Sequence, residues 1–310
     1  MSGKLQGYML GALGAASYGL NPLFALPLYE AGMTADGVLF FRYLFALPVL
    51  AAMILLRGRS FRITRQQALI LIGLGMLVAL SSLTLFLAYN YMDAGIASTI
   101  LFLYPIMVAV IMAAFYRERV NKVTIACIAA AMAGIGLLYH GDGETLSAVG
   151  TLLSLGSALT YALYIVWINK SAVSRVATLA VTFYVLLFGV SLFAVRLWCA
   201  GTVATPPASA PWLWLCLVGL AVFPTAISFG CTTAAINKIG STPTAILGAL
   251  EPVTAVIIGA AVFGEQLTPR IIIGLLMIIG AVSMVIAAPT VASRVASIRR
   301  MFPSLRRRRH

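Results

Sequence analysis

Glu251 is an acidic residue near the middle of a long apolar run of the sequence, 242–263. On insertion scales, an acidic side chain at the centre of a membrane-spanning helix costs about 2.5–3.5 kcal/mol. We therefore expect it to face a wet cavity or a partner group rather than lipid. Three roles are open. The carboxyl group binds a substrate amine, takes up a proton during a transport cycle, or is a protonated packing residue bonded to a neighbouring helix, since burial favours its neutral form.

Arg42 lies about seven residues into another apolar run, 35–56. Its guanidinium could bind a carboxylate, or it could reach outward along its aliphatic stem or pair with an acid of an outer loop. We favour this structural role. The other apolar runs carry no Lys or Arg near their centres. Phosphorylated and strongly anionic substrates need basic clamps, so exchange of nucleotide sugars or sugar phosphates is not expected.

Aromatic and small polar residues recur in these runs at helical spacing, as in Ser82, Phe86 and Tyr89, which stand at i, i+4 and i+7. Hydroxyl groups gain nothing from contact with lipid, so such stripes are expected to point inward. A pocket that mixes rings with a few polar groups suits a small amphipathic ligand. Besides Glu251, the residues that we expect to line it are Tyr18, Asn21, Ser82, Phe86, Tyr89, Thr99, Phe102, Tyr104, Tyr161, Tyr164, Trp167 and Ser228. Aromatic belts at the membrane surface and simple packing remain alternatives.

Prolines interrupt several of the same runs, and four of them are candidate hinges or kinks: Pro22, Pro105, Pro224 and Pro252. Each removes an i→i−4 hydrogen bond and clashes with the preceding turn. The carbonyl groups set free must be satisfied inside the protein or by cavity water. A hinge for alternating access and a static bend are equally compatible with the sequence.

The elements that position these residues are ten apolar runs, each of roughly the 20 residues that a bilayer-spanning helix needs. They are about 7–28, 35–56, 68–90, 95–116, 122–139, 147–168, 177–198, 211–234, 242–263 and 269–288. Spanning β-strands need only ~9–11 residues of alternating polarity. Hydrophobic residues make up 62% of the chain and charged residues 9%, against about 25% charged in soluble proteins. The sequence therefore predicts an all-α integral membrane protein with ten transmembrane helices.

Two stretches of the chain repeat at an offset of 147 residues: Asn90, Pro105 and Glu118 recur as Asn237, Pro252 and Glu265. Basic residues surround the first glutamate but not the second. Five spans in each half force the halves to be inverted relative to each other, as in many secondary transporters. We expect a first five-helix repeat at 1–140, a second, inverted repeat at 147–288, and a basic cytoplasmic tail at 289–310.

The net charge of +13 is unevenly distributed. If the N-terminus is cytoplasmic, ten spans place most of the Lys and Arg residues in inside loops and in the tail. This is the positive-inside bias, and it predicts that both termini are cytoplasmic. Binding of nucleic acid is therefore not expected. The tail could contact anionic lipid or only anchor the topology, and both readings stay open.

No catalytic or metal site is expected. The four cysteines, Cys127, Cys199, Cys216 and Cys231, are scattered without a close pair, which argues against a metal or disulfide framework. There is no zinc-protease motif and no phosphate-cradling loop followed by Lys and Ser or Thr. We expect no cofactor, no enzymatic activity and no ATP-driven transport by this chain alone.

The paired segments P-IMVAVIMAAFYR-E and P-VTAVIIGAAVFG-E resemble the hallmark of the drug/metabolite transporter superfamily, EamA type. The stretch FFRYLFALPVL resembles the Arg-bearing second helix of that superfamily. The length and overall pattern resemble the bacterial aromatic amino-acid and metabolite exporters. One departure is that the Glu-Pro pair of the family occurs only in the second copy, as Glu251-Pro252, whereas the first copy has Tyr104-Pro105.

The sequence thus favours a secondary transporter that works by alternating access around a cavity at the membrane midplane. The resemblance implies export of small metabolites, amino acids first and among them aromatic and other uncharged or apolar ones, across a bacterial inner membrane. A channel would need a continuous polar lining, and a membrane enzyme would need a catalytic constellation. These two remain the alternatives. Whether the protein is a monomer or a weak dimer is open.

Overall fold

In the computed structural model, the part of the chain that is described is helical and contains no strand. That part comprises residues 3–117, 122–139, 147–201, 205–207, 209–239, 244 and 247–284. The predicted basic tail, 289–310, and Glu118 lie outside the described residues.

The first half of the chain forms five apolar segments, two of which are interrupted. Its helices are α1 (Gly3–Tyr18), α2 (Asn21–Glu30), α3 (Ala35–Leu56), α4 (Arg65–Ala88), α5 (Ala94–Leu101), α6 (Tyr104–Tyr116) and α7 (Lys122–Tyr139). The pairs α1–α2 and α5–α6 each make up one candidate span, Gly3–Glu30 and Ala94–Tyr116. Side-chain caps fix where the long helices begin. Thr64 accepts from the Gln67 backbone N–H while the Gln67 side chain accepts from the Thr64 N–H, a reciprocal capping box at the start of α4.

The second half repeats this pattern. Its elements are α8 (Ala148–Lys170), the 3₁₀ turn η1 (Ala172–Arg175), α9 (Thr178–Ala200), α10 (Trp212–Ala221), the π-helical turn η2 (Val222–Ile227), α11 (Ser228–Ile239) and α13 (Leu250–Phe263), followed by a helix at Pro269–Met284. The segment from α10 to α11 is one candidate span, Trp212–Ile239. Its π turn carries Pro224, whose missing N–H and bulky ring disturb the α-helical ladder at that point.

Seven of these helical segments are long and apolar enough to cross a bilayer. Three shorter apolar helices accompany them, Ile125–Leu137, Leu250–Phe263 and Pro269–Met284. Together they occupy the ten runs that the sequence predicts, in the same order. The predicted fold class, an all-helical membrane protein built from two repeats, is confirmed.

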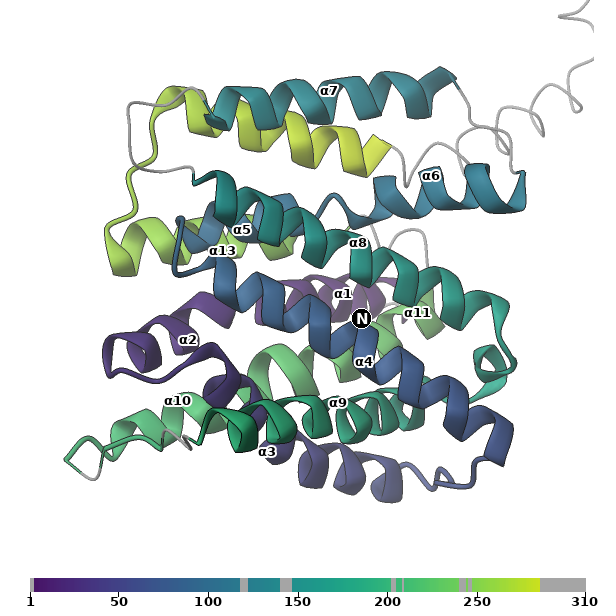
Figure 1. Cartoon of the computed structure of the whole chain (residues 1–310). Coiled ribbons are helices and arrows are strands. Elements are labelled where there is room, and N and C mark those ends of the chain that lie inside the picture. Colours follow the sequence, from purple (N-terminus) through teal and green to yellow (C-terminus); the bar gives the residue numbers. More distant parts are fainter. Residues whose placement is uncertain are drawn as a thin grey trace, which may run out of the picture.

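Equivalent spans of the two halves make equivalent contacts with the opposite half. The first span of each half packs along the third span of the other half: α1 lies against α11, and α8 lies against α4. Likewise, α7 and the helix Pro269–Met284, the last spans of the two halves, lie side by side in Figure 1. A Cβ built on Gly134 in α7 would lie 2.9 Å from the carbonyl oxygen of Gly274, so these two backbones are in close contact.

Small residues allow the same close approach between α1 and α11. A Cβ at Gly7 would lie 2.5 Å from Cγ2 of Ile239, and a Cβ at Gly14 would lie 2.7 Å from Oγ1 of Thr232. The glycine stripe of α1 is therefore used for packing within the chain.

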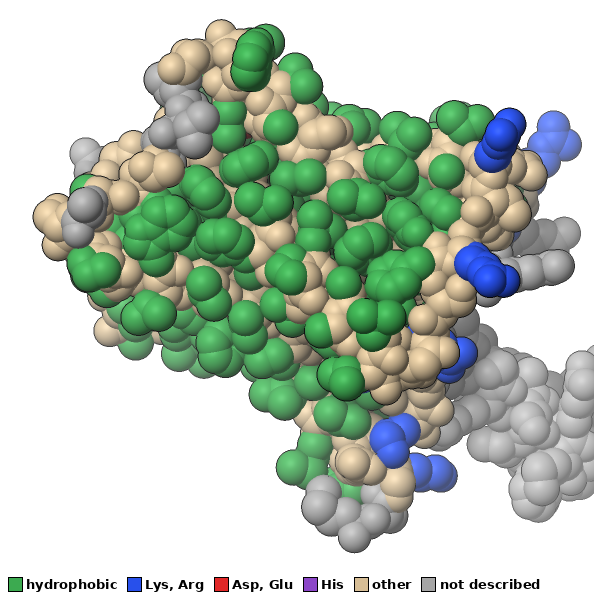
Figure 2. Space-filling view, turned by 90° about the horizontal axis from the view of Figure 1, so that it is seen from below, with side chains coloured by type: hydrophobic (Ala, Val, Ile, Leu, Met, Phe, Trp, Pro, Cys, Tyr) green, Lys and Arg blue, Asp and Glu red, His purple; other side chains and the backbone are tan. Residues whose placement is uncertain are grey.

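The outer surface matches a lipid environment. Figure 2 shows a face covered by hydrophobic side chains, with Lys and Arg side chains gathered at one end. Large apolar side chains such as Leu56, Phe115 and Trp198 are 87%, 78% and 87% exposed, which a soluble protein would avoid. An apolar belt with a basic end is the arrangement that the charge pattern of the sequence predicts.

Candidate functional site

A cavity of about 310 Å³ lies between the two halves and is lined by side chains from both. The first half contributes Gly11, Ala15, Tyr18, Arg42, Tyr43, Val78, Ser81, Ser82, Leu85, Leu101 and Tyr104. The second half contributes Tyr161, Leu186, Thr225, Ser228, Phe229, Thr232, Ile236, Thr244, Gly248 and Glu251. The volume is at the lower end of the roughly 300–1,000 Å³ of small-molecule sites. The cavity therefore has room for a small metabolite.

Interruptions of the helices position the most polar part of the lining. Tyr18 is the last residue of α1, before the break that leads to Pro22 in α2, and Tyr104 is the first residue of α6 and precedes Pro105. In the second half, Thr225 follows Pro224 in the π turn and Glu251 precedes Pro252 near the start of α13. Each of the four predicted hinge prolines is thus within four residues of a side chain that lines the cavity.

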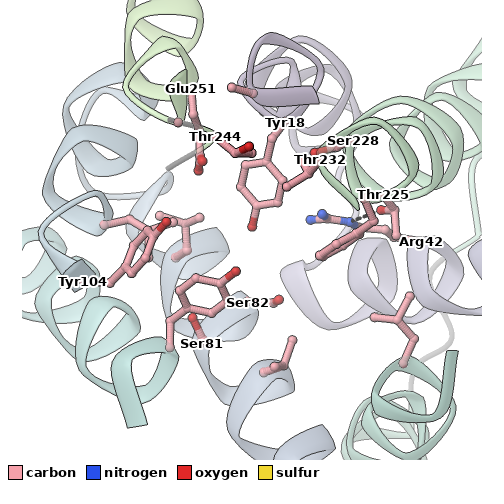
Figure 3. Close-up of a pocket in the computed structure, with 18 of the residues that line it drawn as sticks. Tyr18, Arg42, Ser81, Ser82, Tyr104, Thr225, Ser228, Thr232, Thr244 and Glu251 are labelled. Atoms are coloured by element: carbon pink, nitrogen blue, oxygen red, sulfur yellow. Dashed lines mark hydrogen bonds between the residues drawn. The ribbon is translucent and has the colours of Figure 1, made fainter. Parts of the chain in front are cut away.

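Arg42 forms one side of the site. Its side chain is 4% exposed, and its Nε donates a hydrogen bond of 3.2 Å to Oγ1 of Thr225. The Thr225 hydroxyl in turn donates to the carbonyl oxygen of Leu220 at 3.0 Å. The guanidinium carbon lies 5.4 Å from the centroid of the Phe86 ring, within the range of a cation–π contact. Arg42 is therefore held from two sides and points into the cavity (Figure 3).

The expected pairing of Arg42 with an outer-loop acid is not found. Asp36, the acid nearest to it in α3, pairs with Arg196 of α9, with Nε–Oδ1 at 2.6 Å and Nη2–Oδ2 at 3.1 Å. Within the described ranges, no carboxylate forms an ion pair with Arg42. The Arg42 side chain lines the wall of the cavity.

Glu251 lies on the other side of the cavity, and Tyr18 lies between it and Arg42 in Figure 3. Its backbone N–H donates to the carbonyl oxygen of Gly248 at 3.0 Å, which sets the start of α13. A Cβ at Gly19 would lie 2.5 Å from the carbonyl oxygen of Glu251, so the backbone after α1 is in close contact with the first turn of α13. Among the described residues, no hydrogen bond is made by the Glu251 carboxyl group.

Aromatic rings and hydroxyl groups complete the wall. The rings of Tyr104 and Tyr161 meet edge to face at 4.8 Å, and Tyr164 stacks behind Tyr161 at 5.6 Å. The Tyr43 hydroxyl and Oγ of Ser82 are 2.8 Å apart and share a hydrogen bond. The lining therefore combines one cation, one carboxyl group, several phenol rings and a few hydroxyl groups.

The structure brings six of the predicted site residues into the cavity: Tyr18, Ser82, Tyr104, Tyr161, Ser228 and Glu251. Three others lie close behind the wall. Phe86 is buried under Arg42, Tyr164 backs Tyr161, and Nδ2 of Asn21 donates to the carbonyl oxygen of Tyr18 at 2.8 Å. These three support the wall without lining it.

The remaining four predicted residues lie elsewhere. The Tyr89 hydroxyl is 3.2 Å from Oγ of Ser98 in α5, and the Thr99 hydroxyl donates to the carbonyl oxygen of Gly95. Phe102 is fully buried in the core beside the break between α5 and α6. Trp167 is 42% exposed and packs at Gly73 of α4.

Sequence reasoning did not single out several lining residues, among them Tyr43, Ser81, Thr232 and Thr244. Two of them had a usable signal, because Ser81 adjoins Ser82 and Thr232 stands one helical turn after Ser228. Within the described part of the chain, no group of three or more His, Cys, Asp or Glu residues could hold a metal ion.

A second contact joins the halves at the end of the bundle opposite to the loop between α3 and α4 (Figure 1). The carboxylate of Glu265, after α13, accepts hydrogen bonds from the backbone N–H groups of Ala94 (2.9 Å) and Gly95 (3.4 Å) at the start of α5. Burial raises the pKa of Glu265 to about 7, nearby Asp93 adds to this rise, and the two backbone hydrogen bonds oppose it. Burial also raises the pKa of Asp93. We therefore expect this contact to respond to protonation near neutral pH.

These features define a multi-pass helical membrane protein of two inverted halves with a cavity at their seam. A model of the EamA-like transporter family matches the chain twice, over residues 5–140 and 148–287. The chain therefore belongs to the EamA-like transporter family, within the drug/metabolite transporter superfamily, and is a membrane transporter rather than an enzyme.

Individual relatives agree with this assignment. The chain is 27% identical over 212 residues to an uncharacterized transporter of Archaeoglobus fulgidus, covering 68% of this chain and 74% of that one. It is 25% identical over 213 residues to the uncharacterized transporter YvbV of Bacillus subtilis, covering 67% and 69%. A solved structure described only as "Crystal structure of protein" is similar with a TM-score of 0.66 at 20% identity, over 93% of this chain and 98% of that one. That likeness bears on the fold alone.

Proposed function

We propose that this transporter exports small metabolites, most of all amino acids with aromatic or other uncharged, apolar side chains, by alternating access. The observation that carries the proposal is the composition of the cavity at the seam. It is small, and it combines the rings of Tyr104 and Tyr161 with the charged groups of Arg42 and Glu251. A small amphipathic molecule fits such a lining, with its apolar part on the rings and its polar groups on the anchors.

The interrupted helices supply a means for the two halves to move. Because Tyr18, Tyr104, Thr225 and Glu251 stand next to helix breaks, the wall can change when one helical segment tilts against its continuation. Inverted repeats achieve alternating access by such rocking around a fixed midplane site. We further propose that the transporter resides in a bacterial inner membrane with its basic end in the cytoplasm, in line with the basic end in Figure 2.

The test is reconstitution of the full-length protein into liposomes loaded with a panel of labelled amino acids, with and without a pH gradient. We expect saturable efflux and accelerated exchange when unlabelled substrate is present on the opposite side. Empty liposomes and the variant Glu30→Gln, which alters an exposed acid at the end of α2, are the controls. Flux that does not saturate and shows no counterflow would indicate a channel and contradict the proposal. Absence of flux for the whole panel would contradict amino acids as cargo.

A further inference from the structure

We propose that the cavity is a two-pole site for a zwitterion, in which Arg42 binds a carboxylate and Glu251 binds an ammonium group of the same molecule. This inference rests on the proposed function and assigns the two charged groups of an amino acid to two residues of the site. It concerns which chemical groups the ligand must carry and how they are oriented between the two halves.

The first pole is Arg42. A guanidinium has five N–H donors in a planar fork that matches a carboxylate. Nε is used by Thr225, and the terminal nitrogens point into the cavity (Figure 3). The contacts with Thr225 and Phe86 fix the plane of the group before a ligand arrives. No acid in the described part of the chain forms an ion pair with it, so the buried cation favours binding of an anionic group.

The second pole is Glu251, whose carboxyl group faces the same cavity from α13. Tyr18 lies between it and Arg42, and the two side chains do not form an ion pair with each other. The Tyr18 phenol is a hydrogen-bonding neighbour of Arg42. Arg42 and Glu251, whose formal charges sum to zero, are not paired with each other. An approaching ammonium group favours the ionised form of the carboxyl group.

Only a ligand with both charges satisfies both poles. A simple carboxylate would neutralise Arg42 and leave Glu251 without a partner, whereas a simple amine would do the reverse. A site built around polar groups discriminates strongly against analogues that lack the matching group, by up to roughly 10⁴–10⁵, whereas one methylene in an apolar pocket is worth only about 10–200-fold. The two charged residues should therefore decide which class of substrate binds. The rings of Tyr104 and Tyr161 should set the smaller differences in affinity between substrates with different side chains.

The test uses competition for the binding of labelled phenylalanine to the purified full-length protein. Three unlabelled competitors share the same side chain: phenylalanine, phenylalaninol, which lacks the carboxylate, and 3-phenylpropionate, which lacks the amine. We expect the wild type to prefer phenylalanine over each analogue at least about tenfold, as for a missing hydrogen-bonding group. Arg42→Gln should lose the preference over phenylalaninol and keep the preference over phenylpropionate. Glu251→Gln should show the opposite pattern.

The crossed pattern separates ligand anchors from structural residues, because a merely structural defect lowers the binding of all three competitors alike. Arg196→Gln is the matched control, since it removes an arginine whose pairing with Asp36 lies outside the cavity, and it should keep both wild-type ratios. If Arg42→Gln does not fold, Arg42→Lys and Thr225→Val, which disturb the fork and its support, should reduce the same single ratio. An equal loss for all competitors overturns the two-pole site.

Binding and flux distinguish this inference from the proposed function. If the liposomes transport amino acids but neither variant shows its selective loss of preference, the two-pole site is wrong and the exporter stands. If no amino acid is transported or bound by the wild type, the proposed function itself fails, and the two-pole site fails with it.

Discussion

The two halves interrupt their fourth span at equivalent places but carry different side chains there. In the first half, Tyr104 and Pro105 follow the break, and in the second half Glu251 and Pro252 stand in the corresponding position. Both Tyr104 and Glu251 line the cavity. The scaffold is therefore repeated while the chemistry is not, and one wall is aromatic where the other is acidic. Under the proposed mechanism, a symmetric frame would open toward either side, and an asymmetric pair of anchors would hold the ligand in one orientation.

The largest effect is expected from removing the charged member of this pair. Glu251→Gln keeps the shape of the side chain but abolishes its charge and its ability to release a proton. We expect efflux of the preferred amino acid from liposomes to fall by about 100-fold, in the range for loss of a matched polar anchor, while the protein still folds.

The pH profile of the same variant decides between the roles of Glu251. If the carboxyl group carries a proton through the cycle, the dependence of wild-type efflux on a pH gradient should disappear in Glu251→Gln. Glu30→Gln, at an exposed position, should behave as the wild type. Normal transport by Glu251→Gln with an unchanged pH profile would exclude both substrate binding and proton coupling by this residue.

The next effect tests whether the asymmetry itself matters. Tyr104→Glu makes the two breaks alike, so two carboxyl groups face the single cation Arg42, and the edge-to-face contact with Tyr161 at 4.8 Å is lost. We expect the affinity for a zwitterionic amino acid to fall about tenfold or more, because one buried carboxylate remains unpaired. Tyr104→Phe keeps the ring and should lose less. Wild-type affinity in Tyr104→Glu would show that the difference between the two breaks is incidental.

The structure also shows how far this asymmetry could be predicted from the sequence. Some features can be read directly along the sequence: the apolar runs, the repeat, and the mismatch between Tyr104 and Glu251. They predicted the membrane spans and two residues that line the cavity. The rotation of each helix about its axis is not local. Ser82 and Phe86 stand one turn apart on α4, yet Ser82 lines the cavity whereas Phe86 is covered by Arg42. Only the packing of α3 against α4 and α9 decides which of the two is exposed to a ligand.

Arg42 illustrates the same limit for charges. We allowed for a pair between Arg42 and an acid of an outer loop, but Asp36, in the same helix, pairs with Arg196 of α9. Nothing in the sequence indicates that α9 runs beside α3, because residues 57–177 separate the two helices. A residue for which we expected a structural role therefore lines the cavity.

A further effect concerns the second pair of equivalent positions, Glu118 and Glu265, of which Glu265 lies in the described part of the chain. In the packed seam, Glu265 has a pKa of about 7 because burial disfavours its charge, whereas its ordinary value is 4.5. If this seam opens, the carboxyl group returns toward the ordinary value. The packed state binds the proton more tightly than the open state. Its stability relative to the open state is therefore greatest below about pH 4.5, falls as the pH rises to about 7, and stays nearly constant above pH 7.

Hydrogen exchange of the α5 amides, corrected for the intrinsic pH dependence of exchange, measures this opening. Protection of Ala94–Leu101 should fall by about tenfold or more between about pH 5 and pH 8 in the wild type, following the proton linkage of Glu265. Glu265→Gln, which cannot titrate, should show a flat profile, and Glu30→Gln should keep the wild-type slope. An identical slope in Glu265→Gln would assign the pH dependence to another group, of which Asp93 is the nearest candidate.

The smallest effects on stability, and the most informative ones about motion, are expected at the prolines of the two breaks. Pro105 stands at the first turn of α6 and Pro252 at the first turn of α13, where the N–H that proline lacks has no helical partner. Replacing either by Ala should therefore change the free energy of unfolding by no more than about 1 kcal/mol. It should also let the interrupted helix extend across the break.

If the breaks are hinges, Pro105→Ala and Pro252→Ala each lower the rate of exchange several-fold while ligand affinity is kept, because a continuous helix resists tilting. Pro48→Ala in the uninterrupted α3 is the control and should leave exchange near the wild-type rate. Unchanged exchange in both break variants would identify the breaks as static bends, and a loss in only one would show that the two halves do not share the motion.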